Sequence, residues 1–141
     1  MCIRDRKHTD RKIIIRPHPL YRKSSLHNTL KEKVLNVSNT HWQETDLLKD
    51  GFVSIQEQLQ KAWCTVTYTS GSGIDAVING IPNIACDTGS MVYDVSSKDI
   101  AEVENPYRGE KKEWTNRIAH CQWSIEEFES GECWKHVSKS I

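Results

Sequence analysis

The stretch CTVTYTSGSGIDAVINGIPNIACD, residues 64–87, decides the fold. It begins with a run of β-branched and aromatic residues that predicts a strand, and a turn of small polar residues follows. Ser72 and Asp75 have the spacing of a capping box, which predicts a helix that begins at Gly73. The Gly-Ile-Pro sequence ends this helix, and residues 83–86 return as a strand. We expect the second strand to be a parallel neighbour of the first.

The turn between this strand and this helix, residues 69–73, is suited to a phosphate. Backbone N–H groups, the hydroxyls of Ser70 and Ser72 and the positive end of a helix dipole would all point at one place. The same residues also fit a plain helix N-cap that holds no ligand. The turn is not a Walker A loop, and Ala76 stands where the GxGxxG fingerprint has its third glycine, so the turn does not predict NAD.

Strands and helices alternate through the first part of the chain. Residues 12–16 (KIIIR) predict a buried strand, and a capping box of Ser54 and Glu57 predicts an amphipathic helix that leads into residue 64. This alternation predicts a parallel sheet with helices on its faces. The remaining elements that we expect are a helix over 24–33, a strand over 34–37, a loop over 38–50, a short helix within 96–104, and helices over 111–121 and from 125.

The length and charge of the chain limit its class. At 141 residues it has the length of one domain, which we place at 12–141, with the helices of 111–141 packed on the sheet. Residues 1–11 are polar and aperiodic, and we expect them to be a disordered or non-native lead-in. The 19 basic residues equal the 19 acidic ones, which excludes broad nucleic-acid binding by a basic surface. No apolar run approaches the roughly 20 residues of a membrane span and no signal-peptide core is present, so we expect a soluble, cytoplasmic protein.

Cysteine usage also indicates a reducing compartment. The five cysteines are odd in number and form no CxxC motif, so a disulfide framework is not expected. The spacing of His120, Cys121, Cys133 and His136 fits no zinc pattern, and we expect no metal site there. Three tryptophans are expected to pack the last helices together or onto the sheet, with sugar stacking as the alternative. These are Trp114, Trp123 and Trp134.

A second motif, Arg16-Pro17-His18-Pro19, follows the first predicted strand directly. In open α/β sheets, ligands collect at the carboxyl ends of the strands. The two prolines fix the backbone around His18, whose imidazole is suited to bind a phosphate or to protonate a leaving group, and Arg16 adds a charged donor. A rigid surface turn with an incidental histidine is the alternative. Because both motifs follow strands of one predicted sheet, we expect them to hold one phosphate or diphosphate from two sides.

These motifs together resemble the C-terminal lobe of GT-B glycosyltransferases. The similarity is to the bacterial surface-polysaccharide group, which includes capsule enzymes and sialyl- and Kdo-type transferases, and it covers residues 12–87. In that group an HP motif and a serine-rich motif hold the phosphate of the activated donor. His18 and Pro19 match the HP motif, and Ser70 and Ser72 match the serine motif. The Gly-Ile-Pro sequence matches the connector of the family.

The resemblance implies a single Rossmann-like α/β lobe, a parallel sheet flanked by helices with a helical C-terminus. It would bind a nucleotide-activated sugar as donor substrate, with no metal or other cofactor, and a glycan acceptor in surface or capsular polysaccharide assembly. His18 would be catalytic and protonate the leaving phosphate, while the serine turn stabilises its charge. The implied donor contacts are Arg16, His18, Pro19, Thr69, Ser70, Gly71, Ser72 and Gly73, and the possible sugar or ribose contacts are Asp75 and Asp87.

Alternatives remain at this level. Asp87 also fits a solvated turn residue. In GT-B enzymes an N-terminal acceptor lobe supplies the catalytic carboxylate, so we expect these residues to be a fragment of a longer enzyme. A non-catalytic nucleotide- or sugar-binding module is one rival. A lobe of a sugar-nucleotide epimerase, which shares the architecture, is another.

Overall fold

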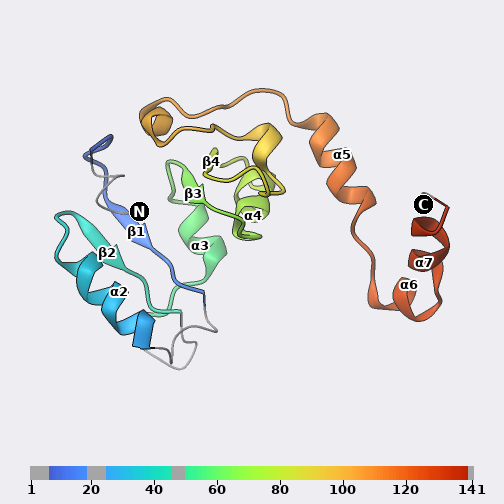
Figure 1. Cartoon of the computed structure of the whole chain (residues 1–141), viewed down its shortest axis with the longest axis horizontal. Helices are drawn as coiled ribbons and strands as arrows, with labels where there is room; N and C mark the ends of the chain where they lie inside the picture. The colour runs from blue at the N-terminus through green and yellow to red at the C-terminus, as the bar shows by residue number, and fades with distance from the viewer. Residues whose placement is uncertain (1–6, 19–24, 46–49, 140–141) are drawn as a thin grey trace. The chain divides into compact units, whose positions relative to one another are not determined.

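A computed structural model describes residues 7–18, 25–45 and 50–139 of the chain. The chain divides into two compact units, Met1–Arg108 and Gly109–Ile141, which are described separately (Figure 1). The grouping of residues 12–141 in one domain stays a prediction. None of the helices within the described ranges is long and apolar enough to cross a membrane.

The first unit opens with a parallel β-α-β arrangement. Strand β1 (Ile13–Ile15) pairs with β2 (Thr40–Trp42), and helix α2 (Ser25–Leu35) connects them. The predicted first helix is confirmed, and the predicted first strand is present but is not buried as expected, because Ile14 is 47% exposed. The predicted strand over 34–37 is wrong, because Val34 is buried within the last turn of α2. The strand comes later, after Asn39 reverses the chain with a left-handed backbone (φ 54°).

The predicted strand-helix-strand unit of residues 64–87 is confirmed. Strand β3 (Thr65–Thr67), helix α4 (Ser72–Ile78) and strand β4 (Asn83–Ala85) follow one another, and β3 and β4 are parallel. Gly80, with φ 78°, ends α4 in a Schellman motif: the Ile81 N–H donates to the Ala76 carbonyl and the Gly80 N–H to the Val77 carbonyl.

Two helices of the first unit, α3 and α4, differ in how their N-termini are capped. Helix α3 (Ile55–Leu59) has the predicted capping box of Ser54 and Glu57. At α4 the predicted capping box of Ser72 and Asp75 is wrong. Gly71 already has helical dihedrals (φ −58°, ψ −22°) and is the N-cap, so Ser72 lies inside the first turn, where its side chain caps nothing.

The apolar core of the first unit lies around β4. Ile84 is fully buried against Ile100 and Val103, and Cys64 and Val66 pack on this cluster. Ile100 and Val103 come from a 3₁₀ helix, η3 (Ile100–Glu104). A second 3₁₀ helix, η2 (Tyr93–Val95), precedes it. The segment between them adds a single parallel bridge from Ser97 to Ile84.

The described strands form two small parallel sheets, β1–β2 and β3–β4. The fold is therefore mixed α/β with parallel strands, and the single continuous sheet that the sequence predicts is not confirmed. Side chains connect the two sheets. The Arg11 guanidinium, before β1, lies 4.2 Å from the ring centroid of Trp63, before β3.

Part of the stretch 1–11, predicted to be a lead-in, contacts the rest of the first unit. Thr9 is buried, and its hydroxyl donates to the Glu104 carboxylate. Arg11 donates to the same carboxylate at 3.0 Å. We call Thr9, Arg11 and Glu104 the clasp, because they join the start of this unit to its last 3₁₀ helix.

The second unit is helical. It consists of α5 (Lys112–His120), α6 (Ile125–Glu129) and α7 (Glu132–Val137), and the predicted capping box of Ser124 and Glu127 opens α6. The Trp123 ring lies 5.2 Å from that of His136, as expected for a packing residue. Trp114 is buried, whereas Trp134 is 69% exposed and does not pack as expected.

Candidate functional site

The turn between β3 and α4 brings together the residues predicted from the serine motif. Thr69, Ser70 and Gly71 are exposed. The Ser70 and Ser72 hydroxyl oxygens lie 2.7 Å apart, and the Gly73 N–H donates to the Ser70 carbonyl at 3.0 Å. This geometry presents two hydrogen-bonded hydroxyls at the carboxyl end of β3.

A neighbouring turn, after β4, contributes Asp87. Its carboxylate accepts a hydrogen bond from the Gly89 N–H at 2.8 Å. Interaction with the hydrogen-bond-accepting, negatively charged carboxylate of Asp87 raises the pKa of Tyr68, the first residue after β3. The Tyr68 ring is 58% exposed. Tyr68 was not among the predicted site residues, although its place directly after a strand is a usable signal.

A buried polar network fixes the two strands beneath these turns. Asn83 is 0% exposed, and its side-chain oxygen accepts from the hydroxyls of Thr65 at 2.8 Å and Thr67 at 3.1 Å. Its amide donates to the Ser96 hydroxyl at 3.1 Å. Thr67 is the last residue of β3, so the network determines where the Tyr68 turn begins. The sequence analysis did not identify this role of Asn83.

Arg16 forms hydrogen bonds that connect the end of β1 to helix α3 and the residues before it. Its Nη1 donates to the Val53 carbonyl at 2.8 Å and to the Gln58 side chain at 2.9 Å, and burial lowers the pKa of the guanidinium. These contacts attach the carboxyl end of β1 to the start of α3. The described partners of Arg16 thus lie in the segment before and within α3, and none lies in the 69–73 turn. Its role as a phosphate ligand stays a prediction.

Two of the remaining predicted residues lie within the described ranges, one after β1 and one in the first turn of α4. His18 is exposed, follows Pro17 directly and lies three residues after the end of β1 at Ile15, and Pro19 lies outside the described residues. Asp75 is exposed in the first turn of α4. The roles of these residues as donor contacts also stay predictions.

The charges around the β3–β4 turns are all negative. Residues 64–97 contain three aspartates and no lysine, arginine or histidine. A phosphate held by the serine turn would therefore need a cation from another segment, because exposed hydroxyls alone do not neutralise its charge.

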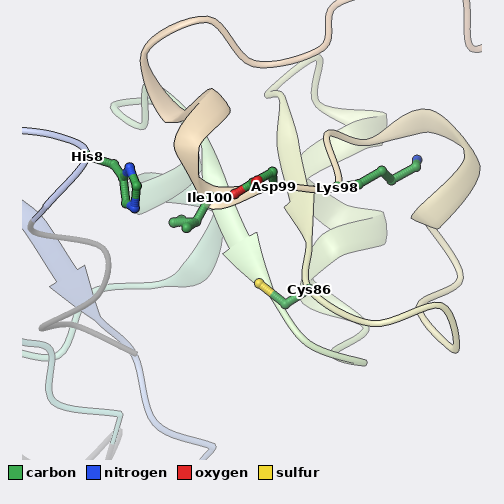
Figure 2. A pocket seen from close by; sticks show the side chains of 5 residues that line it. All are labelled: His8, Cys86, Lys98, Asp99 and Ile100. Carbon is green, nitrogen blue, oxygen red and sulfur yellow. The ribbon is translucent and has the colours of Figure 1, made fainter.

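Two open cavities lie in the first unit, and one of them reaches Cys86, the residue between β4 and Asp87. One of about 280 Å³ is lined by His8, Cys86, Lys98, Asp99 and Ile100 (Figure 2). In Figure 2 the Lys98 side chain extends away from His8, and its amine donates to the Ser96 carbonyl at 2.7 Å. The other cavity, of about 470 Å³, is lined by residues 8–11 and Glu104. Among the described residues, none of the predicted donor contacts lines either cavity.

The chemistry of the other reactive groups is limited. Burial raises the pKa of the Cys64 thiol to about 11, so this thiol is a packing group at neutral pH. Across the described ranges, no three histidine, cysteine or acidic side chains come together as a metal site requires. Comparison of the chain with protein-family models, with curated proteins and with solved structures found no match.

Proposed function

We propose that the first unit is a Rossmann-like lobe that binds a nucleotide-activated sugar, as the donor lobe of a GT-B glycosyltransferase in surface or capsular polysaccharide assembly. One observation carries the proposal. The parallel β3-α4-β4 unit presents a hydroxyl turn and a carboxylate side by side at the carboxyl ends of its strands. This is the edge at which α/β proteins bind nucleotides.

The proposed lobe has the strand order β2-β1-β3-β4. Contact between Arg11 and Trp63 supports it, because these residues precede β1 and β3 and lie together at the amino ends of the two strands. In this order the connection from β1 to β2 and the connection from β3 to β4 run toward opposite edges of the sheet, so a topological switch point lies between β1 and β3. The His18 turn and the serine turn would then flank the crevice at that switch point.

The two turns have different proposed tasks. Ser70 and Ser72 would hydrogen-bond the phosphate, but α4 has only seven residues and its dipole adds little. The positive charge would come from His18, which lies outside the acidic run 64–97. His18 would protonate the leaving phosphate while the sugar passes directly to a glycan acceptor. A further lobe would bind the glycan acceptor and provide the catalytic base.

A non-catalytic nucleotide- or sugar-binding module is the second candidate. The engagement of Arg16 by Val53 and Gln58 favours it, since a transferase site needs strong positive charge at the leaving group. The two candidates share donor binding and differ in turnover. Release of nucleotide from a bound donor in the presence of glycan acceptors distinguishes them.

Titration calorimetry tests the shared step. Nucleoside diphosphates of each common base would be titrated into the chain, into His18→Ala and into the double variant Ser70→Ala/Ser72→Ala. Each change should weaken binding about tenfold, or about 1.4 kcal/mol. His120→Ala and Ser38→Ala, which alter exposed residues elsewhere, should leave the affinity unchanged. Unchanged affinity in both site variants, or no nucleotide binding by the unaltered chain, would overturn the proposal.

A further inference from the structure

We propose that Tyr68 and Asp87 form the sugar-binding part of this site and select neutral sugars over sugars that carry a carboxylate. The inference rests on the proposed function and deepens it. It assigns a role to Tyr68, and it commits to a class of donor: a nucleotide linked to an uncharged, hydroxyl-rich sugar.

The geometry places the pair on neighbouring strands. Thr67 of β3 is opposite Ala85 of β4, so Tyr68 and Asp87 both follow the paired ends of the strands. The Gly89 N–H donates to Asp87 at 2.8 Å and orients the carboxylate, and the exposed Tyr68 phenol follows the neighbouring strand. An added Cβ at Gly89 would lie 3.0 Å from the Asp87 oxygen, so a larger residue there would shift the carboxylate.

The chemistry of the pair fits a polyol. A carboxylate has about four acceptor positions, and the hydrogen bond from the Gly89 N–H uses one of those of Asp87. Sugar hydroxyls are donors for the remaining positions. The exposed ring of Tyr68 offers an apolar face beside them, on which the C–H face of a sugar ring buries apolar surface.

The negative charge around Asp87 would set the preference for neutral sugars over sugars that carry a carboxylate. Asp87 lies in the run 64–97, which also carries Asp75 and Asp94 and has no basic residue. A sugar carboxylate brought to this place would meet a like charge with no counter-ion from these segments, whereas a hydroxyl would meet an acceptor. The same repulsion turns the phosphate end of the donor away from Asp87, toward the serine turn and His18.

Calorimetry with matched ligands tests the inference on the full chain. UDP, CDP, GDP, ADP and dTDP would each be measured alone, as the glucose conjugate and as the glucuronate conjugate, which differ in one carboxylate. For the base that binds, we expect the glucose conjugate to bind about five- to tenfold more tightly than the glucuronate conjugate. In Asp87→Asn this ratio should fall to about one. Asp50→Asn, which makes the same change in net charge at an exposed position outside this run, should keep the ratio.

Tyr68→Phe separates positioning from folding. It keeps the ring and removes the hydroxyl that interacts with Asp87 and can bond the sugar, so the glucose conjugate should bind about threefold more weakly while the nucleoside diphosphate alone binds as before. If no nucleoside diphosphate binds, the proposed function fails and this inference fails with it. If nucleotide binds but the two conjugates bind equally, or Asp87→Asn keeps the ratio, this inference alone is overturned.

Discussion

Asn83 is the residue that connects the core of the first unit to its candidate site. It lies fully buried on β4, and its amide group bonds to side chains of β3 and of the segment after η2. A buried amide of this kind is stable only while its partners remain in place, because each unpaired group pays its full desolvation cost. The network therefore fixes the register of β3 against β4 through side chains as well as backbone.

Replacing Asn83 should cost stability. Asn83→Ala removes three hydrogen bonds and leaves two threonine hydroxyls without this partner, so the free energy of unfolding should fall by about 2–3 kcal/mol. Urea unfolding measures the change. Asn36→Ala, at an exposed position, is the matched control and should shift the value by less than about 0.5 kcal/mol. Equal shifts in the two variants would contradict the importance of the network.

Tyr68 should make stability depend on pH in the alkaline range. Its pKa is raised by Asp87, so the folded chain keeps the phenol proton more tightly than the unfolded chain. This contribution is complete below the ordinary tyrosine pKa and is lost as the pH rises through the raised value. The stability advantage of the unaltered chain over Tyr68→Phe should therefore shrink above about pH 10.

Tyrosinate absorbance gives a direct measurement of the same linkage. The difference between the unaltered chain and Tyr68→Phe isolates the titration of Tyr68. In Asp87→Asn this titration should move to lower pH, because the hydrogen bond from the phenol to a charged acceptor is lost. An unmoved titration would show that Asp87 does not hold the Tyr68 hydroxyl.

At the scale of elements, the turn from β3 into α4 contains two glycines with opposite requirements. A Cβ on Gly73 would lie 2.9 Å from Val92 Cγ2 and 3.1 Å from Thr67 Oγ1, and both neighbours are buried, β-branched side chains. Gly71 has nothing within 4 Å of its added Cβ and has helical dihedrals. Close packing therefore requires glycine at position 73 but not at position 71.

The glycine pair gives a matched test. Gly73→Ala should lower the free energy of unfolding by about 1–3 kcal/mol through overpacking. Gly71→Ala makes the same chemical change two residues earlier and should stay within about 0.5 kcal/mol of the unaltered chain. Thermal or urea unfolding compares them. Similar losses would mean that α4 does not pack against Val92 as described.

Local signals explain which elements were predictable. The capping boxes at Ser54 and Ser124 and the Gly80 stop act within a few residues, and the structure has all of them. The strand at 34–37 was mispredicted because Val34 is equally apolar in a strand and on a helix face, and only tertiary packing decides. The 69–73 turn was found, but Tyr68, Asn83 and the partners of Arg16 depend on which strands and helices become neighbours. A single sequence carries little record of such non-local pairings.

At the scale of the whole molecule, the clasp joins distant parts of the first unit. Hydrogen bonds from Thr9 and Arg11 lower the pKa of Glu104, so the interaction is present at neutral pH and is lost as the pH falls through the lowered value. Glu104→Gln should expose the Arg11 region to faster amide hydrogen exchange at neutral pH. The difference in exchange should disappear only after the pH has fallen below the ordinary glutamate pKa and through the lowered value. Equal exchange at neutral pH would contradict the clasp.

The clasp also has a consequence for synthesis. Thr9 and Glu104 are 95 positions apart, so almost the whole first unit must leave the ribosome before this contact forms. The β1-α2-β2 segment emerges early with local pairings of its own, whereas Trp63 and Glu104 arrive later. A ribosome paused before residue 104 would hold a chain in which the Glu104 carboxylate has not yet reached Thr9 and Arg11. Nascent-chain protection from proteases should therefore rise in two steps, the second only after η3 has emerged.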